Sequence, residues 1–357
     1  MKKIVIACDS YKGCLSSSEV SDAVAEGVSE VYPDCEVVRL AVADGGEGTV
    51  EALVDTLGGH LEWVEVSDPL GRPVRAAYGV AGDLAIIESA AACGLTLLSK
   101  EERNPLIATT KGLGELILAA VDKGCRRFLI GLGGSATNDG GMGMIGAEGF
   151  LEKTRGLQFT IACDVDTPYI GRNGASRVFG PQKGASVQDV EVLEERLRGY
   201  ALKISEDTGI DVSDMPGAGA AGGLGGAFRA YLGAELKRGV DLVLDQIGFD
   251  SVIAGADLVI TGEGCSDYQT LKGKTAAGVL ERAERLNIPV ALVSGAVRDE
   301  KMLRDRGFRI VEAVTPPAMS LEEAMRPETA KHLVAVATRN ILHQFCIYYR
   351  VLHMRNH

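Results

Sequence analysis

Four times along this chain, a short apolar run leads into a loop that combines glycine with carboxylate or hydroxyl side chains. These loops read DSYKG at 9–13, ADGGEGT at 43–49, GGSATNDGG at 133–141 and TGEGCSD at 261–267. Each follows a predicted strand and, with varying clarity, precedes a predicted helix, which is the order of elements in α/β proteins. Because ligands of open α/β sheets bind at the carboxyl ends of the strands, the pattern predicts an α/β fold with a ligand site at these loops.

Glycine is the outlier of the composition. It accounts for 45 of the 357 residues, which is about twice its average share. Six of the fourteen residues at 131–144 are glycine. Glycine in such density lets the backbone approach another group closely, and free amides at helix N-termini bind anions. We therefore expect these loops to hold a phosphate or carboxylate group.

The apolar pattern also predicts the order of the elements. Ser16-x-x-Glu19 and Ser320-x-x-Glu323 are capping boxes that start helices, and short alternating segments between 61 and 89 predict antiparallel hairpins. The predicted strands cover residues 3–8, 36–42, 126–131, 158–163, 256–261, 289–294 and 308–314. Two predicted helices end near residues 31 and 57. The others cover residues 109–122, 187–205, 218–232, 274–286 and 299–306.

The length exceeds that of one ordinary core, so two domains are expected. The simplest assembly is a discontinuous domain of residues 1–60 and 250–357, with an inserted domain of residues 61–249. Residues 107–145 restore α/β order and fit either domain. A cleft between the two domains is the expected ligand site.

Charge and cysteine usage exclude several classes of protein. The net charge of −12 argues against a nucleic-acid groove and against an anionic membrane surface. No run of about 18 apolar residues is present, so no membrane span is expected. Eight cysteines without a CxxC pair are typical of a reducing compartment, and we expect a cytoplasmic protein. The five histidines lie at 60 and beyond 331, so neither a catalytic histidine nor a zinc site is expected.

Familiar nucleotide motifs fit poorly. Gly273-Lys274-Thr275 resembles the end of a P-loop, but the required glycine five residues before Gly273 is Tyr268. GAGAAG at 217–222 satisfies G-x-G-x-x-G, but a polar segment broken by proline precedes it. GLGGSA at 131–136 follows a strand but continues into more loop. A nicotinamide-dependent dehydrogenase therefore remains only an alternative.

Structural explanations compete with functional ones at several positions. Ser16–Ser18 favour helix capping over nucleophilic catalysis, and Asn138-Asp139-Gly140 could be a turn. The glycines of 217–226 could serve close helix packing, and Lys183 could be a solvated surface charge. Asp44 and Glu47 could cap a helix.

Six motifs together resemble, in order, those of the bacterial glycerate kinase family. They are DSYKGCLSS, ADGGEGT, GGSATNDGG, ACDVDTPYIGRNGAS with FGPQKGA, PGAGAAGGLG and ITGEGCSDYQTLKGK, and the resemblance runs from about residue 3 to 340. It implies ATP-dependent phosphorylation of D-glycerate, with 2-phosphoglycerate the usual product. It also implies two α/β domains, one Rossmann-like or flavodoxin-like and discontinuous, the other an inserted domain with a mixed sheet, unlike P-loop architectures. Formation of 3-phosphoglycerate and a non-catalytic protein that binds an anionic metabolite are the alternatives, and a homodimer is left open.

The chain departs from the family pattern in three places. The connection at 149–160 is shorter than usual, and Cys265-Ser266-Asp267 lacks the arginine that usually precedes the aspartate. Residues 343–357 match no family pattern, so they could form a docking tail.

The resemblance and the residue chemistry together give hypothetical roles. Main-chain amides of 133–137 and 217–225 would cradle the ATP phosphates. The nucleotide-binding residues would be Gly133, Gly134, Ser135, Asn138, Lys183, Gly217, Gly219 and Gly222. Magnesium would be held by Asp44, Glu47 or Asp139. Asp267 or Asp164 would accept the substrate proton, with Lys12 assisting the transfer. Glycerate would be bound by Asp9, Ser10, Lys12 and Arg172. Of these, Lys12 and Arg172 would bind its carboxylate group.

Overall fold

The computed structural model describes the backbone of residues 1–271 and 273–355, and side chains up to residue 347. The chain forms two compact units, one of Met1–Asp44 with the chain from Val243 on, the other of Gly45–Leu242. The chain thus passes between units after Asp44 and after Leu242, rather than at 60/61 and 249/250. Helix α2 (Thr49–Leu57) lies in the second unit, because Gly79 of its sheet leaves room for Val54. A Cβ at Gly79 would lie 2.4 Å from Val54 Cγ2.

The first unit contains a five-stranded parallel sheet in the order β11-β10-β9-β1-β2. Its strands are β1 (Lys3–Cys8), β2 (Glu36–Ala41), β9 (Leu258–Ser266), β10 (Val290–Val297) and β11 (Ile310–Ala313). Numbered along the unit, this order is the 2-1-3-4-5 of flavodoxin-like sheets, which confirms the expected fold class. The strand order reverses between β1 and β9, so a ligand is expected outside the carboxyl ends of those two strands.

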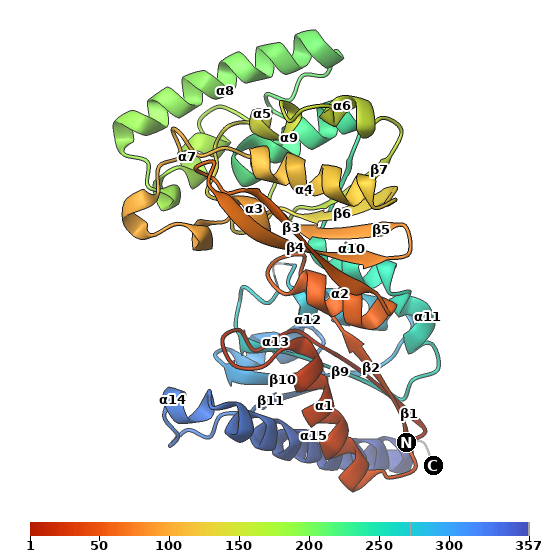
Figure 1. Ribbon diagram of the computed structural model, residues 1–357. Helices are drawn as coiled ribbons and strands as arrows, with labels where there is room; N and C mark the ends of the chain where they lie inside the picture. The colour runs from red at the N-terminus through yellow and green to blue at the C-terminus, as the bar shows by residue number, and fades with distance from the viewer. Residues whose placement is uncertain (272, 356–357) are drawn as a thin grey trace. The chain divides into compact units, whose positions relative to one another are not determined.

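Helices cover both faces of this sheet. They are α1 (Ser17–Val31), α11 (Phe249–Ile253), α12 (Thr275–Arg285), α13 (Glu300–Arg306), α14 (Leu321–Ala324) and α15 (Pro327–Arg355). Helices α1 and α15 pack against each other on one face (Figure 1). Ile4, Ile6 and Cys8 belong to the core beneath them, while the alternate residues of β1 face the side of α12. Phe345 is buried in the same core, so the start of the suspected tail is part of this unit; residues 356 and 357 lie outside the described part of the chain.

The second unit contains a six-stranded mixed sheet in the order β3-β4-β5-β6-β7-β8. Its strands are β3 (His60–Ser67), β4 (Pro73–Ala81), β5 (Leu84–Glu88), β6 (Arg127–Gly131), β7 (Gln158–Ala162) and β8 (Glu235–Lys237). The first three form the expected antiparallel hairpins, and β5 to β8 are parallel. The loops after β5, β6 and β7 therefore meet at one edge of the sheet.

Helices of the second unit also cover both faces of its sheet (Figure 1). Besides α2 they are α3 (Ala90–Cys93), α4 (Lys111–Asp122), α5 (Met142–Ile145), α6 (Phe150–Lys153), α7 (Ala175–Phe179), α8 (Val187–Thr208) and α9 (Ala220–Leu232). Short 3-10 turns cover Leu95–Leu97, Lys100–Glu102 and Pro181–Lys183, and α10 (Gly239–Gln246) runs from the second unit into the first. The core is centred on Phe128 and Phe159, whose rings stack 4.7 Å apart.

Local sequence signals account for most of these elements. Ser16 caps α1 in a full capping box with Glu19, and Ser17 donates its hydroxyl proton to the carbonyl of Cys8. These serines are therefore structural, as the capping pattern predicts. Helix α9 departs from the regular helix expected at 218–232, because Ala221, Gly222 and Gly223 have positive φ angles and kink it.

Candidate functional site

In the first unit, Asp9 stands where the strand order reverses. It follows β1, and its amide donates to the Gly262 carbonyl of β9 at 2.8 Å. Its carboxylate accepts hydrogen bonds from the Thr275 hydroxyl at 2.6 Å and from the Ser10 amide at 2.7 Å. Burial, and then repulsion from Asp44, raise the pKa of Asp9 to about 6, although Thr275, Ser10 and Lys12 act in the opposite direction. Such a carboxyl group can take up and release a proton near neutral pH.

A second carboxylate, Glu263 on β9, anchors a hydroxyl network beside Asp9. Its Oε1 accepts from Ser266 Oγ at 2.9 Å and from Thr270 Oγ1 at 2.5 Å, while Lys274 Nζ lies 3.5 Å from Oε2. Ser266 is also hydrogen-bonded to Ser294 of β10 at 2.6 Å. Sequence reasoning missed this network. The sequence signal for it was Gly273-Lys274-Thr275, which does not fit a P-loop. In the structure this segment places Thr275 at the start of α12, beside Asp9.

The predicted residues of this unit gather at the same sheet edge. Ser10 and the exposed Lys12 follow Asp9 on the loop after β1. Asp267 is half-buried directly after β9, where it accepts from the Gln269 amide at 2.8 Å. The amide of Asp267 donates to Thr270 Oγ1 at 3.0 Å, so it is joined to the Glu263 network. This edge thus combines a buried carboxyl group of raised pKa with an exposed cation.

In the second unit, the loop after β6 divides into an exposed and a buried part. Gly133 and Gly134 are exposed, whereas Ser135 and Asn138 are buried. A Cβ at Gly133 would meet nothing closer than 3.7 Å, and one at Gly134 nothing closer than 3.4 Å. Among the described residues, the amides of these two glycines have no hydrogen-bond acceptor. They are the part of the motif that is open to a ligand.

Lys183 lies beneath this loop and is only 2 % exposed. Its Nζ donates to Ser135 Oγ at 2.9 Å and to the Thr137 carbonyl at 2.6 Å. Burial lowers its pKa to about 7, against the opposing effect of the Asp139 charge. Lys183 is therefore not the solvated surface charge that the sequence left open.

Several buried polar atoms around this loop have no protein partner among the described residues. Asn138 donates to Ser176 Oγ at 3.0 Å, but its Oδ1 accepts nothing. The hydroxyls of Thr137 and Ser89 are also buried without a partner. Because buried polar atoms are nearly always hydrogen-bonded, these atoms point to a ligand or ordered water.

Asp139, by contrast, is saturated with protein donors. Its Oδ2 accepts from the Thr110 amide and hydroxyl at 2.8 and 2.9 Å, from the Gly143 amide at 3.1 Å and from Thr109 Oγ1 at 3.4 Å. Its Oδ1 accepts from the Gly141 amide at 3.1 Å. This geometry favours a structural acceptor over the predicted magnesium ligand. In the parts of the chain that the structure describes, no group of three His, Cys, Asp or Glu residues could hold a metal ion.

The glycines of 217–226 pack closely against protein. A Cβ at Gly222 would lie 2.1 Å from the Thr137 carbonyl oxygen, and one at Gly219 would lie 2.1 Å from the Pro168 carbonyl oxygen. The nearest group at Gly217 would be Cys163 Sγ at 3.2 Å. Close packing therefore explains these glycines, and it brings the kinked segment of α9 against the loop after β6.

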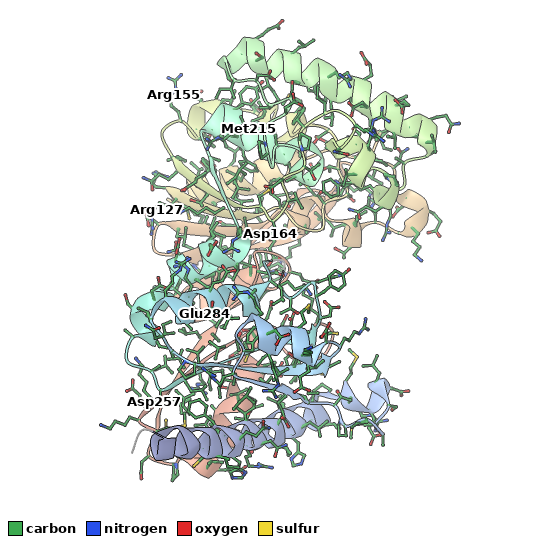
Figure 2. All side chains as sticks on the ribbon, turned by 180° about the vertical axis from the view of Figure 1, so that it is seen from behind. Arg127, Arg155, Asp164, Met215, Asp257 and Glu284 are labelled. Carbon is green, nitrogen blue, oxygen red and sulfur yellow. The ribbon has the colours of Figure 1, made fainter. Side chains whose placement is uncertain are left out.

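Three further candidates come from other loops. Asp164 (labelled in Figure 2) accepts from the Gly239 amide at 2.8 Å, at the start of α10. Arg172 is exposed, and among the described residues it has no ion pair. Glu47 is exposed before α2, whose Val50 amide donates to Glu88 at 3.2 Å. The Val50 amide at the start of α2 thus has a carboxylate of the protein as its acceptor.

The sequence model of the glycerate kinase family matches residues 4–156 and 148–346. The chain belongs to the glycerate kinase family. It is 44 % identical over 353 residues to the glycerate kinase of Bacillus subtilis strain 168, covering 90 % of this chain and 92 % of that protein. It is 42 % identical over 370 residues to the glycerate 2-kinase of Escherichia coli K12, covering 95 % and 97 %. The resemblance found in the motifs and the expectation of a kinase are thereby confirmed.

The fold is shared as well. The crystal structure of a Salmonella typhimurium LT2 protein assigned as glycerate kinase 2 matches with a TM-score of 0.87 at 42 % identity, covering 98 % of this chain and 99 % of that one. The family match ends at 346, close to where the motif resemblance ends. Its two segments overlap at 148–156, at the short connection noted in the sequence. Family membership implies that the protein binds a substrate and a nucleotide. None of the described helices combines the length and apolar character needed to cross a bilayer.

Proposed function

We propose that this protein is an ATP-dependent kinase that phosphorylates D-glycerate on its 2-hydroxyl group. The observation that carries the proposal is the likeness to glycerate 2-kinase of Escherichia coli over 95 % of the chain. The buried Asp9 at the strand-order reversal of the first unit supports it, because proton transfer from a hydroxyl group needs such an acceptor. We also propose that the two units act as the two domains of the enzyme.

The nucleotide would bind on the second unit. The exposed amides of Gly133 and Gly134 have no protein acceptor among the described residues, so they can donate to phosphate oxygens. The unpartnered atoms of Thr137 and Asn138 lie on the same loop. Of the glycines in the other motif, Gly217, Gly219 and Gly222 would then contribute by shaping this loop through close packing.

Glycerate would bind on the first unit. Ser10 and Lys12 lie on the loop after β1 and can hold a hydroxyl and a carboxylate group. We assign the proton-acceptor role to Asp9 in place of the predicted Asp267, because Asp9 stands at the strand-order reversal and burial raises its pKa to about 6. Asp267 instead closes a turn beside the Glu263 network. For direct transfer, the phosphoryl group and the hydroxyl oxygen must be aligned in the reacting complex.

A magnesium ion would neutralise charge on the ATP phosphates. Of its predicted ligands, Asp139 does not fit this role, since five protein donors surround its carboxylate. Asp44 and Glu47 remain candidates for the ion. The residues of the chain itself would bind the phosphates, orient the substrate and hold the proton.

An ADP-release assay with and without D-glycerate tests the activity. We expect release to depend on D-glycerate, and to fall at least a hundredfold in Asp9→Asn. Asp34→Asn is the matched control, since Asp34 is exposed before β2, at the opposite edge of the same sheet. ADP release that does not depend on D-glycerate would refute the proposed substrate. Full activity of Asp9→Asn together with an inactive Asp267→Asn would move the acceptor role to Asp267.

The position of the phosphoryl group needs a separate measurement. Phosphorus and carbon NMR of the product distinguish 2-phosphoglycerate, which we expect, from 3-phosphoglycerate. Binding of D-glycerate without any ADP release would instead favour a non-catalytic binding protein.

A further inference from the structure

Lys183 is a buried ammonium group without an ion pair. Only 2 % of the residue is exposed, and among the described residues no carboxylate lies within ion-pair distance of Nζ. The turn that follows fixes its backbone, because Gly184 has φ +98° and a Cβ there would lie 2.5 Å from the Arg103 carbonyl oxygen. Burial of a charge without an ion pair is costly, so an anion bound near Nζ would stabilise the charged form.

The surroundings of Lys183 show where that counter-charge would bind. Its two acceptors, Ser135 Oγ and the Thr137 carbonyl, belong to the loop whose exposed part is Gly133-Gly134. An ammonium group has three donors, and these two bonds use two of them. A buried positive charge that binds the same loop as the exposed amides strengthens anion binding at those amides, because screening by water is weak around it.

We infer that Lys183 is a positioning residue for ATP: it fixes the loop of Ser135 and Thr137 from beneath and strengthens phosphate binding through its charge. This inference rests on the proposed function, in which that loop binds the nucleotide. If Lys183 only held the loop through its hydrogen bonds, ATP affinity would not change when the amino group loses its charge. If the charge itself strengthens phosphate binding, ATP affinity depends on pH.

The direction of that dependence follows from linkage. The pKa of Lys183 is about 7, so its charge is present at pH 6 and mostly lost at pH 8.5. Asp139 of the same loop and Cys93 of α3 are the titratable groups that face it, and the Asp139 charge favours its protonated form. Burial raises the pKa of Cys93, which keeps that thiol neutral over this range. Arg103, whose backbone packs on Gly184, is the cation of the neighbouring segment.

Calorimetric titration of ATP between pH 6 and 8.5 tests the inference with Lys183→Arg and Lys183→Met. The terminal phosphate of ATP titrates in the same range, so the variants supply the reference. We expect wild-type affinity to match Lys183→Arg at pH 6 and to approach Lys183→Met at pH 8.5, about tenfold weaker. Lys153→Met is the matched control and should follow wild type, because Lys153 pairs with Asp122 on the surface. A constant ratio between wild type and Lys183→Arg at every pH would overturn the inference.

A second measurement needs no folded variant. In protein labelled with ¹⁵N-lysine, one ammonium signal should titrate near pH 7, and ATP should move its midpoint upward, since coupling is reciprocal. A midpoint that ATP leaves unchanged overturns the inference, whatever the variants do. ADP release with D-glycerate is measured in parallel. Turnover without the pH effect would support the proposed function and refute the role of Lys183. The pH effect without turnover would support the role of Lys183 and refute the proposed activity. Absence of ATP binding would refute both.

Discussion

Replacing Asp9 with asparagine should stabilise the protein at neutral pH while it abolishes turnover. The pKa of Asp9 is about 6 because of burial and repulsion from Asp44, whereas an ordinary aspartate titrates near 3.8. Between pH 4 and 6 the folded chain therefore keeps a proton that the unfolded chain has lost. The free energy of unfolding must fall as pH rises through this interval. A difference of about two pK units corresponds to about 3 kcal/mol.

Asparagine at position 9 removes this penalty, because it is neutral throughout. Asparagine has one acceptor oxygen, so it can accept from the Thr275 hydroxyl or from the Ser10 amide but not from both, and the lost hydrogen bond costs about 1 kcal/mol at every pH. Relative to wild type, the stability of the variant should therefore rise by about 3 kcal/mol between pH 4 and pH 6.5, which leaves a net gain of about 2 kcal/mol that stays constant above.

Urea unfolding, followed by circular dichroism at half-unit steps from pH 4 to 7.5, measures this gain. Asp34→Asn, at an exposed position of the same unit, should run parallel to wild type at every pH. ADP release measured on the same samples should be lost in Asp9→Asn despite its greater stability. Parallel stability curves of Asp9→Asn and wild type would refute the reasoning, since they would mean that burial of the ionised carboxyl group does not destabilise the folded protein.

Three further substitutions, one of them with a matched control, separate structural from functional roles. Gly140→Ala should destabilise by about 2–4 kcal/mol in thermal unfolding, because its φ is +66° and its Cβ would lie 2.2 Å from Tyr169 Oη; Gly149→Ala, with φ +73° and open space around it, should cost about 1 kcal/mol. Asp139→Asn should also cost about 2–4 kcal/mol and leave the magnesium dependence of turnover unchanged, while a changed dependence would restore its metal role. Asp164→Asn keeps the acceptor for the α10 amide, so turnover should stay within about threefold of wild type, and a loss of a hundredfold would mark Asp164 as the proton acceptor.

The sequence predicted the elements of the fold well where hydrophobic periodicity and caps agree. The Ser16 capping box and the alternating strands of the last third are examples of that agreement. The place of α2 was not predictable, because it depends on Gly79 of β4 making room for Val54 of α2. The kink at Ala221–Gly223 was missed for a related reason: it is imposed by packing against the loop after β6, and no local signal encodes that contact.

The candidate site was predictable in residue type more than in role. Asp9, Ser10 and Lys12 gather at the strand-order reversal because they directly follow β1, and such a position is readable from sequence. The burial of Lys183 was not readable, since FGPQKG is polar and short. Glu263 escaped notice because its partners, such as Thr270, come from a turn whose path the sequence does not reveal.

The glycine clusters show why motif density is a poor guide to ligand contact. Gly140 and Gly222 lack side chains because protein atoms occupy the space that a Cβ would take. The Gly140 amide donates to the Gly222 carbonyl at 3.0 Å, so the two motifs support each other directly. Within the loop after β6, it is Gly133 and Gly134 that combine exposure with amides that lack acceptors among the described residues. Most of the glycine in these motifs therefore serves to bring backbone segments together, so that a short stretch of main chain is held rigidly for a phosphate. Loss of activity on substituting a buried glycine would then report on folding, and only substitutions at the exposed pair would report on the ligand.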